Sequence, residues 1–522
     1  MTAITGQAIA MIVYFVALII IGIFAYNRTK SLDDYMLGGR DLNPTVAALS
    51  AGAADMSGWL LMGLPGALYL SGIVEGWIAI GLTLGQWANW KWVAPRLRSY
   101  TQVAKNSITV PTFLGNRTHD ISHSVSVVAG LVIFVFFTLY VSSGMVAGGT
   151  FFETAFGLDY HLGMTIVSGV VVLYTLVGGF LAVSWTDMVQ GIMMVAALLL
   201  VPIVGTVAVG GLGEVADAVT ATNPDFLSLF GGATVIGVIS NLAWGLGYPG
   251  QPHIIVRFMA LRSPKEATSA RRIGIGWMIF SCLGACATAI VGIAAHYKGL
   301  VEIGEEKRES VFIIMGQYLF PYIIAGFMLA AILAAIMSTI SSQLLVTSSA
   351  IVEDVYNTVR KGDWQGNEGV LLGRIAVLAV AILAAIFAWF RTDSILNLVA
   401  FAWAGFGAAF GPAVVLSLYW RKLTWQGTLV SMIVGAVTVG VWGTFGWFGL
   451  YEIVPGWILA LLAAWAVSTA TYREDAAIDA EFEEAVALSK ADFTEIESRF
   501  GEPQLAGPTI GIGNDPRRTP TQ

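Results

Sequence analysis

Long apolar runs separated by short polar stretches dominate the pattern of this chain. A hydrocarbon core about 30 Å thick needs roughly 20 apolar residues in one helix. The runs predict helices near 6–26, 44–70, 74–95, 124–151, 161–180, 187–210, 232–257, 273–297, 311–341, 371–390, 394–419, 427–447 and 453–472. Because only helices and closed barrels satisfy backbone groups in lipid, we expect an all-α membrane protein with about 13 transmembrane helices.

Composition and charge add an orientation. Hydrophobic residues make up 56% of the 522 residues and charged residues only 12%, whereas a soluble domain has about 25% charged residues. The first apolar run has no Lys or Arg before Arg28, so it lacks the basic region of a cleavable signal. Most Lys and Arg fall in loops on one side of the alternation, which predicts an N-terminus outside and a C-terminus inside.

Two of the predicted spans are interrupted. The second carries Gly52, Asp55, Ser57 and Gly58, and the seventh carries the run "WGLGYPGQPH" from Trp244 to His253. Interrupted helices in corresponding positions of two halves indicate an inverted-repeat transporter with its site between the repeats. The predicted division is 1–43 (first helix and inner loop), 44–210 (repeat 1, helices 2–6), 232–419 (repeat 2, helices 7–11), 420–472 (two peripheral helices) and 473–522 (an acidic cytoplasmic tail).

The second span suggests an ion and a zwitterion bound together. An unwound stretch survives in a membrane only where it faces protein or a wet cavity, and it offers carbonyls to a cation and amides to an anion. Asp55 fits this interpretation because ionisable residues inside spans mark ion or proton paths. The alternative, which is compatible, is an Asp that caps the half-helix after the break.

Oxygen-bearing and aromatic residues form two further candidate groups. Ser338 and Thr339 are adjacent hydroxyls one turn after Ala335, and a hard cation takes hydroxyl and carbonyl ligands. The alternative is that these hydroxyls bond back to their own helix or join neighbouring helices. Trp59, Trp244, Tyr248 and Tyr140, whose rings have apolar faces and polar tips, are placed near the breaks or mid-span.

Other chemistries find little support. "GLGYPG" (Gly245 to Gly250) matches a dinucleotide motif, but no strand precedes it. The five His residues show no ligand spacing, no catalytic cluster indicates an enzyme, and Cys282 and Cys286 lie one turn apart in one predicted helix. Neither a nucleic acid nor an obligatory protein partner is expected. The acidic tail is expected to be solvated rather than regulatory.

Several long runs carry a family resemblance. They are "ALSAGAADMSGWLLMGLPGALYLSGIVEGWIAIGLTLGQWANWKWV", "GGFLAVSWTDMVQ", "WGLGYPGQPHIIVRFMA", "ILAAIMSTISSQLLVTSSAIVEDVY" and "AWAGFGAAFGP". In these runs the chain resembles the bacterial sodium/proline symporters of the sodium/solute symporter family. The resemblance implies a five-plus-five inverted-repeat fold of the amino-acid transporter type in the bacterial cell membrane. It also implies sodium-driven uptake of L-proline.

The resemblance also implies roles for particular residues. Sodium, the only metal expected, would be bound by Ala53, Met56, Ala335, Ser338 and Thr339. Asp55 matches an essential carboxylate beside that site, Asp187 a carboxylate on the inner sodium path, and Arg40 a basic residue near the inner mouth. The substrate residues carried over are Ser57, Gly58, Trp59, Tyr140, Trp244, Tyr248 and Pro252. Ala54 departs from relatives that have Ser there.

Alternating access is the expected mechanism, and two alternatives stay open. The first is the same fold with another small carboxylate solute, such as a monocarboxylate or pantothenate. The second is a solute sensor whose transporter-like core signals through the tail, although the tail has no recognisable kinase or phosphoacceptor module. A channel fits less well, because broken helices around an aromatic site suit occlusion better than conduction.

Overall fold

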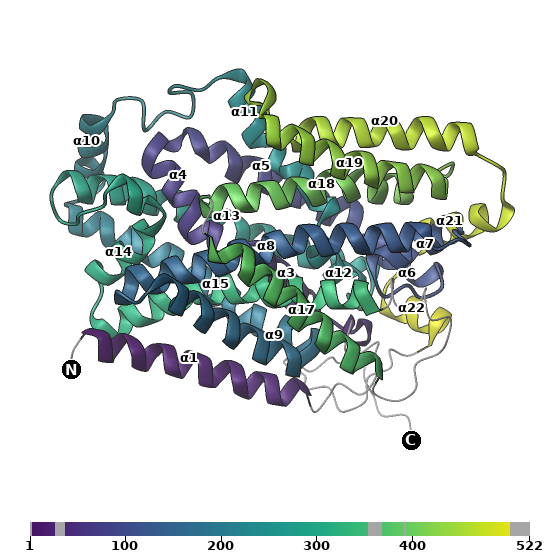
Figure 1. Ribbon diagram of the computed structural model, residues 1–522, viewed down its shortest axis with the longest axis horizontal. Helices are drawn as coiled ribbons and strands as arrows, with labels where there is room; N and C mark the ends of the chain where they lie inside the picture. The colour runs from purple at the N-terminus through teal and green to yellow at the C-terminus, as the bar shows by residue number, and fades with distance from the viewer. Residues whose placement is uncertain (1–2, 27–36, 353–367, 391–392, 502–522) are drawn as a thin grey trace.

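Helices build the described part of the chain. The computed structural model describes residues 3–26, 37–352, 368–390 and 393–501. Figure 1 shows long helices running side by side along one direction. Within the described ranges the only β pairing is an isolated bridge between Leu42 and Leu261. The prediction of an all-α protein is confirmed.

The apolar runs become spanning helices. Nine helices in the described residues are long and apolar enough to cross a membrane. They cover Ile4–Phe24, Ser124–Phe156, Gly179–Val209, Pro264–Tyr297, Tyr322–Val352, Leu371–Trp389, Ile395–Tyr419, Trp425–Phe445 and Ile453–Thr471. The remaining predicted spans are present as shorter or interrupted helices, so the count of about 13 crossings and the orientation of the termini stay predictions.

The helix bounds follow from these runs. Before the tail they are α1 (Ala3–Tyr26), α3 (Pro44–Asp55), α4 (Leu64–Ser71), α5 (Gly76–Ala88), α6 (Ala94–Val103), α7 (Val110–Arg117), α8 (Ser124–Phe156), α9 (Tyr160–Val209), α10 (Leu212–Thr222), α11 (Val235–Leu242), α12 (Pro252–Met259), α13 (Ala267–Tyr297), α14 (Val311–Leu319), α15 (Tyr322–Ser349), α17 (Glu368–Trp389), α18 (Ile395–Tyr419), α19 (Trp425–Phe445) and α20 (Ile453–Thr471). Short 3-10 or π turns connect several of them, including η1 (Gly38–Arg40), η2 (Trp59–Gly63), η3 (Ile73–Glu75), η4 (Asn89–Val93) and η5 (Ala243–Gly250).

Both predicted breaks are present. The second span stops at Asp55, because Met56 leaves the helical region with φ −84° and ψ 80°, and it resumes as the π turn η2. The seventh span narrows into the 3-10 segment η5, which contains Pro249. It restarts at Pro252, where proline at the first position of a helix leaves no hydrogen bond unmade.

One predicted division is present and one predicted span was wrong. The spans expected at 161–180 and 187–210 meet at a kink at Gly179, whose φ of 61° suits glycine, so α9 contains two helices joined without a loop. The ninth span, expected at 311–341, is divided into α14 and α15. Phe320 is extended with φ −118° and ψ 147°, as a residue before proline prefers, and Pro321 then precedes the first residue of α15.

The acidic tail packs against the core more closely than expected. It forms α21 (Ala476–Leu488) and α22 (Phe493–Phe500), and Phe482, Ala485 and Ile496 are buried. Figure 1 shows this pair in yellow at the end of the molecule where α6 and α7 lie. The expectation of a solvated tail was therefore wrong for these helices, because their apolar side chains are buried against other parts of the protein.

Candidate functional site

A cluster of oxygen atoms joins the end of α3 to the middle of α15. The Ser338 hydroxyl donates to the Ala53 carbonyl at 2.7 Å and lies 3.1 Å from the Ala335 carbonyl. The Thr339 hydroxyl lies 3.4 Å from the same Ala53 carbonyl. The structure thus brings together four of the five residues predicted to bind sodium. The fifth, Met56, is buried at the break itself.

The chemistry of this cluster suits a small hard cation. All of its polar atoms are carbonyl or hydroxyl oxygens, which are ligands that such cations accept. The hydroxyl hydrogens now point at carbonyls, and they can rotate away when a cation takes the oxygen lone pairs. In the ranges that the structure describes, no group of three His, Cys, Asp or Glu residues could hold a metal. A charged cage for a divalent ion is therefore not seen there.

Asp55 meets the break of the other repeat. Its Oδ2 accepts a 2.6 Å hydrogen bond from the Tyr248 hydroxyl, and its Oδ1 is buried without a hydrogen-bond partner among the described residues. The side chain of Ser57, rather than that of Asp55, faces the amide of Trp59, at 3.4 Å. The capping alternative is therefore not what the Asp55 side chain does here.

Aromatic rings line the junction of the two breaks. Trp59 and Trp244 have ring centroids 5.9 Å apart, and Trp403 of α18 meets Tyr248 edge-on at 5.1 Å. The Trp403 indole also donates to the Trp244 carbonyl at 2.8 Å. Tyr451 stands 5.5 Å from Trp244 on a further side. Sequence reasoning missed Trp403 and Tyr451, although Trp403 lies inside one of the runs that carry the resemblance.

The other predicted substrate residues lie around these rings. Tyr140 of α8 is buried, and its hydroxyl lies near Ser57. A Cβ on Gly58 would come within 2.9 Å of the Ala147 Cβ and 3.1 Å of the Ile336 Cγ1. Pro252 is buried at the start of α12. Glycine thus lets the break approach α8 and α15 closely.

Asp187 of α9 lies in a separate buried network. Its Oδ2 accepts hydrogen bonds from Ser50 at 2.9 Å, from Arg257 at 3.1 Å and from Ser342 at 3.3 Å. Both charged side chains are fully buried. Ser342 is one turn beyond Thr339 on α15, so the network lies one turn from the oxygen cluster.

Arg257 has a role that the sequence analysis did not identify. The charge pattern takes this last residue of the predicted span 232–257 with the basic residues of the inner loop after it, but it is inside α12 and pairs with Asp187. The rule that drew attention to Asp55, an ionisable residue inside a span, would have identified it. Arg40 is also buried, and it donates to the Met259 carbonyl at 2.8 Å and the Ser107 carbonyl at 2.7 Å. It therefore joins the end of α12 to the loop after α6.

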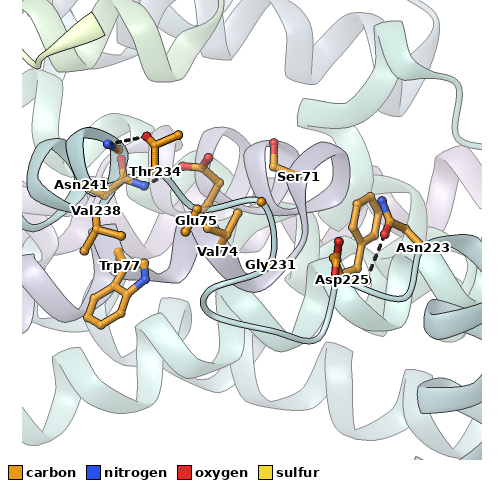
Figure 2. A pocket seen from close by; sticks show the side chains of 14 residues that line it. Ser71, Val74, Glu75, Trp77, Asn223, Asp225, Gly231, Thr234, Val238 and Asn241 are labelled. Carbon is orange, nitrogen blue, oxygen red and sulfur yellow. Dashed lines mark hydrogen bonds between the residues drawn. The ribbon is translucent and has the colours of Figure 1, made fainter.

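A cavity between the end of α4 and α11 is distinct from this site. Figure 2 shows Glu75, Trp77 and Asn241 on its walls, and its volume is about 390 Å³. The Asn241 amide donates to Glu75 at 3.1 Å. None of the predicted site residues lines this cavity.

Comparison with known proteins gives consistent results. The family model described as "Sodium:solute symporter family" matches residues 35–435 of this chain. The chain is 56% identical over 466 residues to the high-affinity proline transporter PutP of Bacillus subtilis (strain 168), covering 89% of this chain and 98% of that protein. It is 50% identical over 487 residues to the sodium/proline symporter of Staphylococcus aureus (strain JH9), covering 91% and 94%.

A solved structure shares the fold. It is the substrate-bound outward-open state of a Na+-coupled sialic acid symporter, with a TM-score of 0.76 and 18% identity. The alignment covers 90% of this chain and 99% of that one. At this identity the likeness concerns the arrangement of the helices alone.

Proposed function

We propose, on the premise that this chain belongs to the sodium:solute symporter family, that it performs sodium-coupled secondary active uptake of L-proline by alternating access. It is a multi-pass protein of the bacterial cytoplasmic membrane and a transporter rather than an enzyme. The names of relatives that are 56% and 50% identical over most of the chain support proline as solute and sodium as coupling ion.

The observation that carries the proposal is the contact of Ser338 and Thr339 with the Ala53 carbonyl. This contact between hydroxyl and carbonyl oxygens joins α3, which ends at the break, to the continuous helix α15. We assign sodium binding to Ala53, Met56, Ala335, Ser338 and Thr339. Asp55 is assigned to support this site. Asp187 is assigned to the path by which sodium leaves toward the inner face, where the tail lies (the tail face). A cation here would hold α3 against α15 and so order the break.

The solute is assigned to the junction of the breaks. Backbone amides after α3 make no regular helical hydrogen bonds: that of Ser57 donates to the Asp55 carbonyl at 3.1 Å and that of Trp59 to the Ser57 hydroxyl at 3.4 Å, contacts that a solute carboxylate would replace. The rings of Trp59, Tyr140, Trp244 and Tyr248, together with Gly58 and Pro252, would enclose the pyrrolidine ring. Such aromatic faces with polar tips suit a small amphipathic solute.

Coupling follows from shared elements. Ala53 and Asp55 are in the last turn of α3, and Asp55 receives the Tyr248 hydroxyl from η5. Sodium that orders α3 therefore also places Tyr248. By linkage, proline must then raise the affinity for sodium by the same factor that sodium raises the affinity for proline.

The division of the chain is part of the proposal. Repeat 1 is assigned to 44–210 and repeat 2 to 232–419, preceded by 1–43 and followed by the peripheral helices 420–472 and the tail 473–522. The two breaks, at 56–58 and 243–250, fall near the start of each repeat. A terminus outside at residue 1 and a terminus inside at residue 522 follow from the charge pattern.

Uptake by purified protein in proteoliposomes tests the function. Labelled proline should accumulate when an inward sodium gradient is imposed and should not when potassium replaces sodium. Unlabelled proline should compete, and a monocarboxylate or pantothenate should not. Equal uptake with and without the sodium gradient would refute coupling, and stronger competition by another solute would reassign the substrate.

A further inference from the structure

The tail helix α21 docks where α6 and α7 end. The Ser99 hydroxyl of α6 donates a 2.8 Å hydrogen bond to the Ala485 carbonyl of α21. Phe482 is 7% exposed, and its ring meets Tyr100 of α6 edge-on with centroids 6.0 Å apart. Figure 1 shows α21 beside α6 and α7. The tail thus rests on a specific surface of the core.

Cationic groups surround this aromatic anchor. The guanidinium carbons of Arg117 and Arg421 each lie 5.4 Å from the Phe482 ring, within the range of a cation–π contact. His119 lies 3.1 Å from the Glu481 carboxylate. The surface is therefore basic and aromatic, and the helix that covers it is acidic.

The segment between α21 and α22 makes a second attachment. The Lys265 amide donates to the Ala491 carbonyl at 3.1 Å, and the Lys265 ammonium lies 3.6 Å from Asp492. Lys265 belongs to the short segment between α12 and α13. The tail thereby contacts elements from both predicted repeats.

The core beneath the tail consists of two groups of elements, and the boundary between these groups is called the seam below. The tail contacts both groups. On one side, Arg98 of α6 donates to the carbonyls of Leu261 and Arg262, and Leu261 pairs with Leu42 before α3. On the other side, Arg117 of α7 donates to the Ser417 carbonyl of α18 at 3.0 Å. The candidate site lies between the same two groups, with α3 and α12 facing α8, α15 and α18. A path from the site to the tail face must open along this seam.

We propose that α21 and α22 form a clamp across the seam, and that the site opens toward the tail face only when the clamp leaves α6. The inference rests on the proposed transport function. The chain enters α21 from α20, which packs against α18 and α19, so the tail contacts able to break are those to α6 and Lys265. Opening must also break the direct hydrogen bond across the seam from Arg96 of α6 to the Leu418 carbonyl of α18, at 2.8 Å. The buried Phe482 supplies most of the hold, because exposed ion pairs such as Lys265 with Asp492 contribute little.

A reversible cross-link tests the clamp directly. In the full chain, Ser99→Cys and Ala485→Cys place two thiols on residues that are in direct contact, since the Ser99 hydroxyl reaches the Ala485 backbone carbonyl. Oxidation should lower sodium-driven proline uptake at least about tenfold by removing the tail-open state, and a reductant should restore it. The unsubstituted protein, whose own thiols are Cys282 and Cys286, receives the same treatment as control. Undiminished uptake with the cross-link complete would overturn the clamp, whereas absence of uptake by the unsubstituted protein would overturn the transport function instead.

A point substitution tests the clamp without a cross-link. Phe482→Ala removes the buried anchor, and Phe500→Ala is the matched control because Phe500 is 36% exposed on α22. Releasing the clamp favours the state that is open toward the tail, so fewer molecules are open to the outer face, from which sodium binds during uptake. The sodium concentration for half-maximal uptake should therefore rise about threefold or more in Phe482→Ala. Phe500→Ala should leave it unchanged. Equal values for Phe482→Ala and the unsubstituted protein, in samples with the same elution profile, would overturn the proposal.

Discussion

The Tyr248 hydroxyl donates a 2.6 Å hydrogen bond to Oδ2 of Asp55. Tyr248 belongs to the break of the seventh span and Asp55 to the end of the half-helix before the break of the second. Both side chains are almost fully buried. The two interruptions are almost two hundred residues apart along the chain. This hydrogen bond joins them, beside the oxygen cluster on Ala53.

Removing this hydroxyl should weaken sodium binding. In Tyr248→Phe the ring remains, but Asp55 loses its donor, and a hydrogen bond to a charged group is worth about 1.5–3 kcal/mol. We expect the sodium concentration for half-maximal proline uptake to rise at least about tenfold. Tyr451→Phe is the matched control, because that hydroxyl donates to the Ala400 carbonyl at 2.7 Å and not to Asp55. An equal effect of both substitutions would contradict a specific role of the Asp55 contact.

The hydroxyls of α15 should matter for sodium more than for folding. Ser338→Ala removes a proposed sodium ligand, so we expect about a tenfold loss of apparent sodium affinity, or about 1.4 kcal/mol. Thr347→Ala is the comparison, because its hydroxyl bonds back to the Gln343 carbonyl of the same helix at 2.7 Å. Sodium-dependent proline binding to purified protein measures both. If the two variants bind sodium alike, the oxygen cluster is structural.

Breaking the Arg257 and Asp187 pair should destabilise the protein. Arg257→Met leaves a buried carboxylate unpaired, at a cost of about 3–5 kcal/mol. Adding Asp187→Leu removes the stranded charge, so the double variant should melt closer to the unsubstituted protein than Arg257→Met does. Thermal unfolding in detergent measures this recovery. Additive losses in the double variant would show that the two side chains do not stabilise each other.

Gly58 should not tolerate a methyl group. The Cβ of Gly58→Ala would lie 2.9 Å from the Ala147 Cβ, so the break would have to withdraw from α8, and overpacking of this kind costs about 1–3 kcal/mol. We expect loss of proline uptake and a lower melting temperature. Gly276→Ala on α13 is the control, because nothing lies within 4 Å of its Cβ. Combining Gly58→Ala with Ala147→Gly should recover part of the loss, and no recovery would place the cause elsewhere.

Local signals found much of the site. Asp55 and the glycines stand out in an apolar run, so the break of the second span is visible in the sequence, and Pro249 and Pro252 mark the break of the seventh. The hydroxyls of Ser338 and Thr339 did not stand out by themselves. Their assignment needed the family resemblance, because isolated hydroxyls in membrane helices more often bond to their own helix.

The sequence by itself determined the membrane class, the approximate spans and the two interrupted helices, because lipid forces apolar length and internal hydrogen bonding on every crossing. Only the tertiary structure decided which partners meet: Tyr248 with Asp55, Arg257 with Asp187, and α21 with α6. These pairs join residues far apart along the chain, and each depends on how helices pack rather than on the pattern within one helix. The tail is a further example. Its acidic composition predicts solvation, and only the tertiary structure shows the basic, aromatic surface against which Phe482 packs.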